Sequence, residues 1–293
     1  MKNSHSTSIA SMTTLAIAGL ATLTSCGSTE ESGAGLIAHI EAGSVTVGTK
    51  FNQPGLGLKE ASGELTGLDV DVATHIVNRI AADNGWEEPE ITWRECPSSQ
   101  RETLIQNGEV DLIAATYSIN KSRNEAVNFG GPYLLTHQAL LVRLDDDQIT
   151  RLEDLGAGKI LCSVSGSTPA QKVKDSLPDV QLQEYDTYSS CVEALRQGNV
   201  DAMTTDATIL NGYAAQDDGA FTVIEMTKDD MPFTDEHYGI GLAKDDQEAT
   251  DAVNKALQEM YDSGDSATLI TKNLGKNATG VSTDVPGDLA FIG

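Results

Sequence analysis

The chain has 293 residues and carries 44 acidic against 19 basic side chains, a formal net charge of −25. So large an acidic excess argues against nucleic-acid binding, because that affinity depends on neutralising phosphates with lysine and arginine. Hydrophobic residues make up 39% of the chain, which is enough for one or two cores, and the length favours two domains or lobes over one.

The first 25 residues have the pattern of an export signal. Lys2 opens a weakly charged leader, and the apolar stretch over residues 9–23 is too short for a comfortable membrane span. A small-residue cleavage site follows, with Cys26 directly after it. This pattern resembles the lipobox of bacterial lipoproteins, which implies that Cys26 becomes the mature N-terminus and carries lipid. The alternative is an ordinary signal peptide with an incidental cysteine.

Both ends of the mature chain are expected to lie outside the fold. Residues 27–35 are mostly Gly, Ser, Thr and Glu, so we expect residues 26–43 to be a flexible, lipid-anchored tether. Gly, Asn, Thr and Asp are frequent near the other end, where we expect residues 278–293 to form a loose tail. The protein is then exported and anchored to the outer face of the cell membrane.

Strands and helices alternate after the tether. Residues 44–48 and 90–94 are expected to be strands. Apolar residues between positions 72 and 80 form one stripe of a helix, which Asp69 or Asp71 can cap. This alternation is typical of an α/β fold with a largely parallel sheet.

Residues 97–123 are expected to form a capped helix, a tight turn, a buried strand and the start of a second helix. Ser99 and Glu102 have the spacing of a capping box. Arg101 lies in the first turn of one helix, and Arg123 lies in the first turn of the next. Two guanidinium groups near helix N-termini, beside the mouth of a strand, indicate an anion site.

The pattern restarts with an expected strand over residues 159–164. Thr168 and Pro169 then begin a helix, a start that leaves backbone N–H groups pointing outward. Residues 189–201 match residues 98–111 in both serines and in Glu, Leu, Gln, Gly, Val and Asp, apart from one extra residue. The near-repeat indicates two lobes of like design around a shared crevice, where ligands of open α/β sheets bind. Chance similarity of two amphipathic units is the alternative.

The two copies of the repeat differ in the charged residues that follow or end them. The first runs into Thr116 and is followed by Arg123, whereas the second ends in Asp206. An arginine on one side and an aspartate on the other would suit a zwitterionic ligand. Because the second lobe is inserted in the first, two strands must cross between the lobes, and we expect these crossings at residues 133–138 and 235–238.

Three cysteines remain besides the one at the cleavage site, so at most one intramolecular disulfide forms. Export permits a disulfide, and Cys162 with Cys191 is the favoured pair because both fall in the second predicted lobe. Three buried free thiols, Cys96 included, are the alternative. We expect no metal site, because there are no paired CxxC motifs, and the aspartates at 145–147 are interpreted as a solvated loop rather than a calcium loop.

Several segments in order resemble the family-3 extracellular solute-binding proteins, the polar amino-acid receptors of bacterial ABC importers. Among them the chain is most similar to the glutamate-binding lipoproteins of actinobacteria. No single segment would identify the family, but their shared order over nearly the whole mature chain is specific. The segments are VGTK at 47–50, GLDVDVA at 67–73, QRETLIQNGEVDLIAATYSI at 100–119, FGGPY at 129–133, SGSTPAQ at 165–171, TTDATIL at 204–210 and YGIGL at 238–242.

The resemblance implies an α/β, two-lobed periplasmic-binding-protein-like fold of type II. Lobe two is inserted in lobe one, and the ligand cleft lies between them. We expect lobe one to comprise residues 44–134 and 239–277, and lobe two to comprise residues 135–238 with two hinge crossings.

The resemblance also assigns the groups that bind an amino acid. Arg123 matches the family's arginine that grips the α-carboxylate with both arms of its planar fork. The backbone N–H of Thr168 would hold the same carboxylate, and Ser118 would add a hydroxyl. Asp206 matches the acid that binds the ammonium group, helped by the Thr116 carbonyl. A simple helix cap is the alternative role for this aspartate.

Further residues match those that bind the side chain in glutamate-specific members. Arg101 matches the second arginine, which pairs with the side-chain carboxylate, and Ser98 lies on the same helix cap. Lys50 stands where those members carry an arginine, so it keeps the charge and loses the bidentate geometry. The alternative roles are a solvated helix residue for Arg101 and no ligand contact for Lys50.

The function implied is that of a receptor for L-glutamate, or for glutamate and aspartate. Lobe closure on the ligand would present it to an ABC permease and its ATPase. We expect a monomer without enzymatic activity, cofactor or nucleic-acid partner. The same fold with a neutral ligand such as glutamine is one alternative. A dehydratase-like enzyme is a second alternative, although the sequence offers no acid/base pair beyond Asp206.

Overall fold

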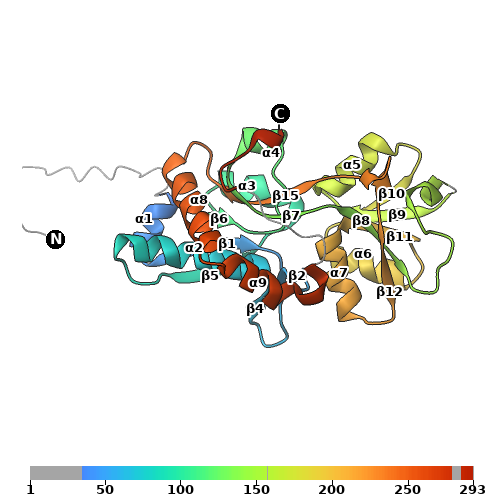
Figure 1. Ribbon diagram of the computed structural model, residues 1–293, viewed down its shortest axis with the longest axis horizontal. Helices are drawn as coiled ribbons and strands as arrows, with labels where there is room; N and C mark the ends of the chain where they lie inside the picture. Colours follow the sequence, from blue (N-terminus) through green and yellow to red (C-terminus); the bar gives the residue numbers. More distant parts are fainter. Residues whose placement is uncertain (1–34, 157, 279–284, 293) are drawn as a thin grey trace, which may run out of the picture. The chain divides into compact units, whose positions relative to one another are not determined.

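The computed structural model describes residues 35–156, 158–278 and 285–292 (Figure 1). The expected signal peptide, the lipidation site at Cys26 and the first part of the expected tether lie outside these residues. No helix in the described ranges is long and apolar enough to cross a membrane.

The first sheet has five strands in the order β5-β1-β6-β15-β7. β1 pairs in parallel with β5 and β6, whereas β15 runs antiparallel to β6 and β7. The parallel pairs follow from the alternation of strand and helix in the sequence, because each crossover passes through a helix. The strands are β1 (Ser44–Thr49), β5 (Glu90–Glu95), β6 (Leu112–Ile113), β7 (Asn128–Thr136) and β15 (Glu236–Leu242).

The second sheet also has five strands, in the order β10-β9-β11-β8-β12. β9 pairs in parallel with β10 and β11, and β8 runs antiparallel to β11 and β12. The strands are β8 (Gln138–Arg143), β9 (Ile160–Val164), β10 (Gln181–Tyr185), β11 (Ala202–Asp206) and β12 (Phe221–Glu225).

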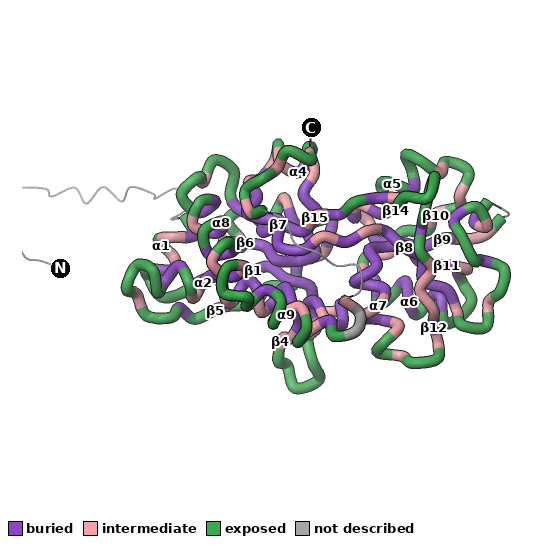
Figure 2. Tube along the Cα trace, viewed as in Figure 1, coloured by how far each residue is buried: buried purple, intermediate pink, exposed green. Residues whose placement is uncertain are grey.

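Helices flank both sheets, and Figure 2 shows that the chain is buried along the central strands and exposed on the outer helical turns. Those with the first sheet are α1 (Leu36–Glu41), α2 (Leu68–Asn84), α3 (Arg101–Gln106), α4 (Lys121–Ala126), α8 (Gln247–Asp262) and α9 (Asp265–Leu274). Those with the second are α5 (Thr168–Ser176), α6 (Tyr188–Arg196) and α7 (Ala207–Gln216). Short elements complete the described chain: β2 (Asn52–Gln53), β3 (Gly57–Lys59), β4 (Leu65–Thr66), β13 (Thr227–Lys228), β14 (Met231–Pro232) and the 3-10 turns at Ser98–Gln100, Leu152–Gly156, Gly275–Ala278 and Ala290–Ile292.

The two sheets share one plan. In each, three parallel strands have the first of the three in the middle, and an antiparallel strand lies beside the third. The near-repeat in the sequence falls on equivalent positions, because residues 98–111 lead into β6 and residues 189–201 lead into β11. The repeated sequence therefore accompanies a repeated topology.

The chain passes between the sheets twice. β7 ends at Thr136 and β8 begins at Gln138, so one passage lies at His137. The return passage lies between β12 and β15, and Glu236 at the start of β15 pairs with Thr136. The two connections therefore run side by side.

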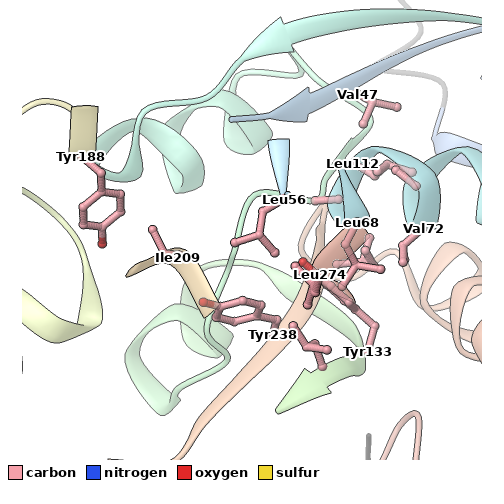
Figure 3. Close-up of a cluster of buried hydrophobic side chains, with 14 of the residues drawn as sticks. Val47, Leu56, Leu68, Val72, Leu112, Tyr133, Tyr188, Ile209, Tyr238 and Leu274 are labelled. Atoms are coloured by element: carbon pink, nitrogen blue, oxygen red, sulfur yellow. The ribbon is translucent and has the colours of Figure 1, made fainter. Parts of the chain in front are cut away.

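One apolar cluster extends across both sheets. Figure 3 shows Leu56, Leu68 and Tyr133, which belong to the part of the chain around the first sheet, together with Tyr188 of α6 and Ile209 of α7. All five side chains are buried. These contacts remove apolar surface of both sheets from water. They therefore stabilise the packing of the two sheets against each other as well as each sheet itself.

Cys162 and Cys191 form the expected disulfide, which joins β9 to α6. Cys96 is a free, buried thiol at the end of β5. The alternative of three free thiols is therefore wrong.

The expected flexible tether over residues 26–43 is wrong at its C-terminal end. Residues 36–41 form α1, and Leu36 and Ile40 are buried in the large apolar cluster. The side chain of His39 contacts Asp111 at 2.5 Å. The prediction failed because three apolar residues, 36, 37 and 40, directly follow the polar stretch. A short helix is enough to pack these side chains against the core.

The expected loose tail over residues 278–293 is also wrong in part. The backbone N–H of Gly287 donates to the Gly131 carbonyl at 2.7 Å, and Leu289 and Ile292 pack against a buried cluster beneath them. The ring of Phe291 lies 3.8 Å from that of His237. A few apolar residues fix residues 285–292 to the strands, although the local composition is that of a loop.

Neither expected side-chain cap forms. α2 begins after Gly67 without a side-chain capping bond, and α3 likewise lacks one. The two carboxylates instead bind groups elsewhere in the chain. Asp69 accepts a hydrogen bond from the backbone N–H of Thr116, and Glu102 forms an ion pair with Arg123.

Candidate ligand-binding site

The residues assigned by resemblance lie around the ends of β6 and β11, where loops of the two sheets meet. A cavity of ≈ 450 Å³ opens beside Arg123, and it is lined from one side by Ser98 and Asn120 and from the other by Ser167 and Thr168. Thr168 is half-buried, and the remaining assigned residues are buried: Lys50, Ser98, Arg101, Thr116, Ser118, Arg123 and Asp206. The structure therefore brings all of the assigned residues to one region.

Arg123 joins the two halves of the site. It lies in α4, whose cap Asn120 accepts from the Arg123 backbone N–H. Its Nη1 donates to the Ser118 carbonyl at 2.7 Å and to Thr168 Oγ1 at 2.9 Å, and its Nη2 donates to the Gly166 carbonyl at 2.9 Å. Burial, and then the charge of Arg101, lower the pKa of Arg123 to about 10. The guanidinium already binds oxygen atoms from the segment after β6 and from the segment that leads from β9 into α5, one beside each sheet.

Arg101 is buried among backbone carbonyls. Its Nη1 donates to Ala115 and Thr116 at 3.3 and 3.2 Å, and its Nη2 donates to Gly166 at 3.2 Å. The guanidinium carbon also lies 4.3 Å from the centre of the Tyr117 ring. Within the described ranges, no carboxylate forms an ion pair with Arg101. A buried guanidinium held only by neutral oxygens can accept the negative charge of a ligand.

Lys50 adds a third cation beside Arg101. Its Nζ donates to the Cys96 carbonyl and to Ser98 Oγ, both at 2.8 Å. Burial, and then the charge of Arg101, lower the pKa of Lys50 to about 7. A cavity of ≈ 10 Å³ lies beside it and is also lined by Tyr188 from the second sheet.

Asp206 places a carboxylate opposite these cations. It stands at the end of β11 and before α7, but its side chain makes no capping bond to the helix. Oδ2 accepts from the Tyr238 hydroxyl at 2.5 Å, whereas Oδ1 is buried without a hydrogen-bond partner among the described residues. Burial, and then the charge of Glu236, raise the pKa of Asp206. The alternative role as a helix cap is therefore wrong.

Glu236 is a second buried acid that the sequence did not indicate. It lies at the start of β15, and hydrogen bonds from Ser118 and Thr234 and the charge of Arg123 partly offset the burial that raises its pKa. The hydroxyl of Ser118 is thus bound to Glu236, rather than standing alone as expected. An acidic residue two positions before the apolar segment at 238–242 was the available signal.

Asp69 is a further buried acid that supports the site, and the sequence did not indicate this role. Its Oδ2 accepts from Thr116 N at 2.8 Å, and its Oδ1 accepts from the Tyr133 hydroxyl at 2.6 Å. Thr116 has a φ of +45°, a left-handed conformation that is unfavourable for a residue with a branched side chain. The Asp69 carboxylate stabilises this turn, which aims the Thr116 carbonyl at Arg101. Burial raises the pKa of Asp69 to about 6.

Gln53 completes the described groups around Thr116. Its Oε1 accepts from Thr116 Oγ1 at 3.2 Å, and its buried Nε2 has no partner among the described residues. The polar loop after β1 was the only signal for it.

Across the described residues, no group of three or more His, Cys, Asp or Glu side chains could hold a metal ion.

The sequence pattern of the bacterial extracellular solute-binding proteins, family 3, matches residues 45–276. The chain belongs to this family. Members are extracellular, so this solute-binding protein is exported, and they are binding proteins, which confirms the prediction that the chain is not an enzyme.

Two relatives match this family-3 protein over almost its whole length. The glutamate-binding protein GluB of Corynebacterium efficiens is 65% identical over 98% of this chain and 97% of its own. The glutamate-binding protein GluB of Corynebacterium glutamicum is 68% identical over 94% of this chain and 93% of its own.

A solved structure supports the same architecture. An ancestral arginine-binding protein bound to glutamine superposes with a TM-score of 0.69 at 30% identity, over 80% of this chain and 98% of its own. The prediction of a two-lobed α/β fold of type II is therefore confirmed. The two sheets described above are the cores of the two lobes.

Proposed function

We propose that this protein binds L-glutamate, with aspartate as a second ligand, between its lobes and delivers it to an ABC importer. The observation that carries the proposal is the environment of Arg101. Its guanidinium is buried, is hydrogen-bonded to carbonyl oxygens and has Lys50 as a neighbour. A ligand with a second carboxylate would supply the negative charge that this cluster lacks, whereas an amide would not.

The α-amino and α-carboxyl groups have separate partners in this proposal. Arg123 and the backbone N–H of Thr168 would bind the α-carboxylate. Asp206 Oδ1 would accept from the ammonium group, because it is a buried carboxylate oxygen without a described partner. The Thr116 carbonyl and Ser118 would complete that half of the site.

The side-chain carboxylate would bind Arg101 and Lys50, with Ser98 Oγ beside them. The two corynebacterial relatives are glutamate-binding proteins by name, and their 65% and 68% identity supports carrying the ligand over. Glutamine is the second candidate, because Arg101 already holds neutral carbonyl oxygens and could hold an amide oxygen in the same way.

The remaining features follow from the proposed transport role. Cys26 would carry the lipid anchor, and the tether would end before α1. Lobe one would comprise residues 44–134 and 239–277 and lobe two residues 135–238, with the monomer closing around its ligand. The closed form would then dock on the permease, whose ATPase drives uptake.

Titration calorimetry of the mature chain with glutamate, aspartate, glutamine and arginine tests the proposal. We expect glutamate to bind most tightly and arginine not to bind. If glutamine binds as tightly as glutamate, the role given to Arg101 is wrong. Mass spectrometry of the membrane-released protein tests the anchor, which an unmodified Cys26 would refute.

A further inference from the structure

Gly166 brings the backbones of the two lobes into contact. It lies between β9 and α5, and a Cβ built on it would stand 2.7 Å from Ser99 Cα and 2.8 Å from Ser99 N. Ser99 lies in lobe one, in the turn before α3. Backbone atoms at that distance cannot rotate away as a side chain can. The Gly166 carbonyl also accepts from both Arg101 and Arg123, so this close approach places it between the two arginines.

Gly212 makes a second contact of the same kind elsewhere on the boundary. It lies within α7 of lobe two, and its Cβ would stand 2.3 Å from the Pro54 carbonyl oxygen in the first loop of lobe one. The neighbouring Tyr213 hydroxyl donates to the Asn52 carbonyl. A glycine inside a helix costs stability relative to alanine, so its presence here needs a reason outside the helix.

We propose that Gly166 and Gly212 are closure positions: only a residue without a side chain lets lobe two reach lobe one at these points. Any Cβ at either position then holds the cleft open, moves the Gly166 carbonyl or the α7 helix away from lobe one, and weakens ligand binding without touching a ligand atom. This inference rests on the proposed function, because it needs a ligand bound by closure.

Gly166→Ala is tested against Gly198→Ala. Gly198 lies in the same lobe with nearly the same φ, +73° against +76°, but its Cβ would meet nothing within 4 Å. Both variants therefore carry the same backbone strain, and only one carries the contact between lobes. Calorimetry with glutamate is expected to show affinity lower by about tenfold or more in Gly166→Ala than in Gly198→Ala, because the competent closed state is less populated. Equal affinities would overturn the role of Gly166.

Gly212→Ala gives a second test, in which thermal stability and glutamate affinity are expected to respond differently. Alanine favours the helix, which offsets the packing lost where α7 moves away from lobe one, so the thermal midpoint of the ligand-free protein is expected to change little, while glutamate affinity falls by about tenfold or more. Gly156→Ala is the control, because its Cβ would also meet nothing within 4 Å. A purely structural role would instead lower the midpoint and the affinity together, which would overturn the inference for Gly212.

Small-angle X-ray scattering reads closure directly. With saturating glutamate, the unaltered protein and both controls are expected to contract, and Gly166→Ala and Gly212→Ala to contract less. Equal contraction would overturn the inference. Should the unaltered protein bind another amino acid of the panel instead, the glutamate proposal fails while the same comparison with that amino acid still decides the closure positions.

Discussion

At the scale of single residues, the site gathers charges that the fold has removed from water. Burial, and then the charges of Arg101 and Arg123, lower the pKa of Lys50, and burial raises the pKa of Asp206. Charges held in this way are costly for the folded protein without a partner of opposite sign. The proposed ligand, a zwitterion with a second carboxylate, would offset that cost, and stability would then be exchanged for affinity at these positions.

Arg101→Ala is expected to weaken glutamate binding much more than glutamine binding, because only glutamate has a second carboxylate. Losing one partner of a buried charge pair costs about 2–5 kcal/mol. Arg123→Ala is expected to remove binding of both, because both ligands have an α-carboxylate. Calorimetry measures each pair, and Lys121→Ala serves as control for net charge because it removes an exposed cation on the same helix. Equal losses of both ligands in Arg101→Ala would contradict these roles.

Glutamate affinity is expected to fall as pH rises above about 7. Lys50 has its pKa lowered to about 7, so it loses its proton in the free protein above that pH. A carboxylate beside Lys50 favours the charged form, so binding there requires proton uptake. Calorimetry at about pH 8, in two buffers with different heats of ionisation, counts those protons. Lys50→Met is expected to bind without them, and the same uptake in this variant would assign the protons to another group.

At the scale of elements, two segments with the composition of linkers belong to the fold. α1 buries Leu36 and Ile40, and residues 285–292 cover a buried cluster that includes Tyr117 and Phe129. Tyr117 in turn lies under the guanidinium groups of Arg101 and Arg123. The C-terminal segment therefore supports the site from outside although it contributes no residue to it.

Replacing Leu289 and Ile292 together with alanine is expected to lower the free energy of unfolding by about 2 kcal/mol, since both side chains are partly buried on that cluster. Urea unfolding followed by circular dichroism measures the loss. Val285→Ala is the control, because Val285 is 59% exposed. A double variant as stable as Val285→Ala would show that the segment rests on the strands without stabilising them.

At the scale of the whole molecule, the two lobes share one apolar cluster besides their separate sheets. The cluster joins Leu56 and Tyr133 to Tyr188 and Ile209 across the boundary. The disulfide lies within lobe two alone. Cooperation between the lobes therefore depends on packing and on the contacts near the closure positions.

The lobes are expected to unfold together in the presence of glutamate. Both tryptophans, Trp86 and Trp93, lie in lobe one and pack against the shared cluster, so their fluorescence reports that lobe, whereas circular dichroism reports both. The two urea transitions are expected to superimpose, and glutamate at about a hundredfold its Kd is expected to add about 2.7 kcal/mol. Separate midpoints with saturating ligand would contradict a shared core.

Local pattern was sufficient for much of the fold, whereas the roles of the proposed site residues came from the family resemblance. Strand and helix alternation predicted the parallel strands, and the near-repeat predicted two lobes of one plan. The choice of Cys162 and Cys191 needed only the knowledge that both lie in one lobe. The expected caps at Asp69 and Glu102 failed because each carboxylate found a partner far along the chain, and such partners are not visible in local spacing.

The sequence by itself determined which chemistry the site could hold: two arginines at helix starts, an aspartate after the matching strand and a lysine in the first loop. Only the tertiary structure decided which of these groups are buried, which are already bound and which are left for a ligand. It brought Asp69 within hydrogen-bond distance of Thr116 and Glu236 within hydrogen-bond distance of Ser118. It also brought the backbone of Gly166 into contact with that of Ser99. The physical reason is that burial and close approach arise between segments distant in the chain, whereas residue type and periodicity are local.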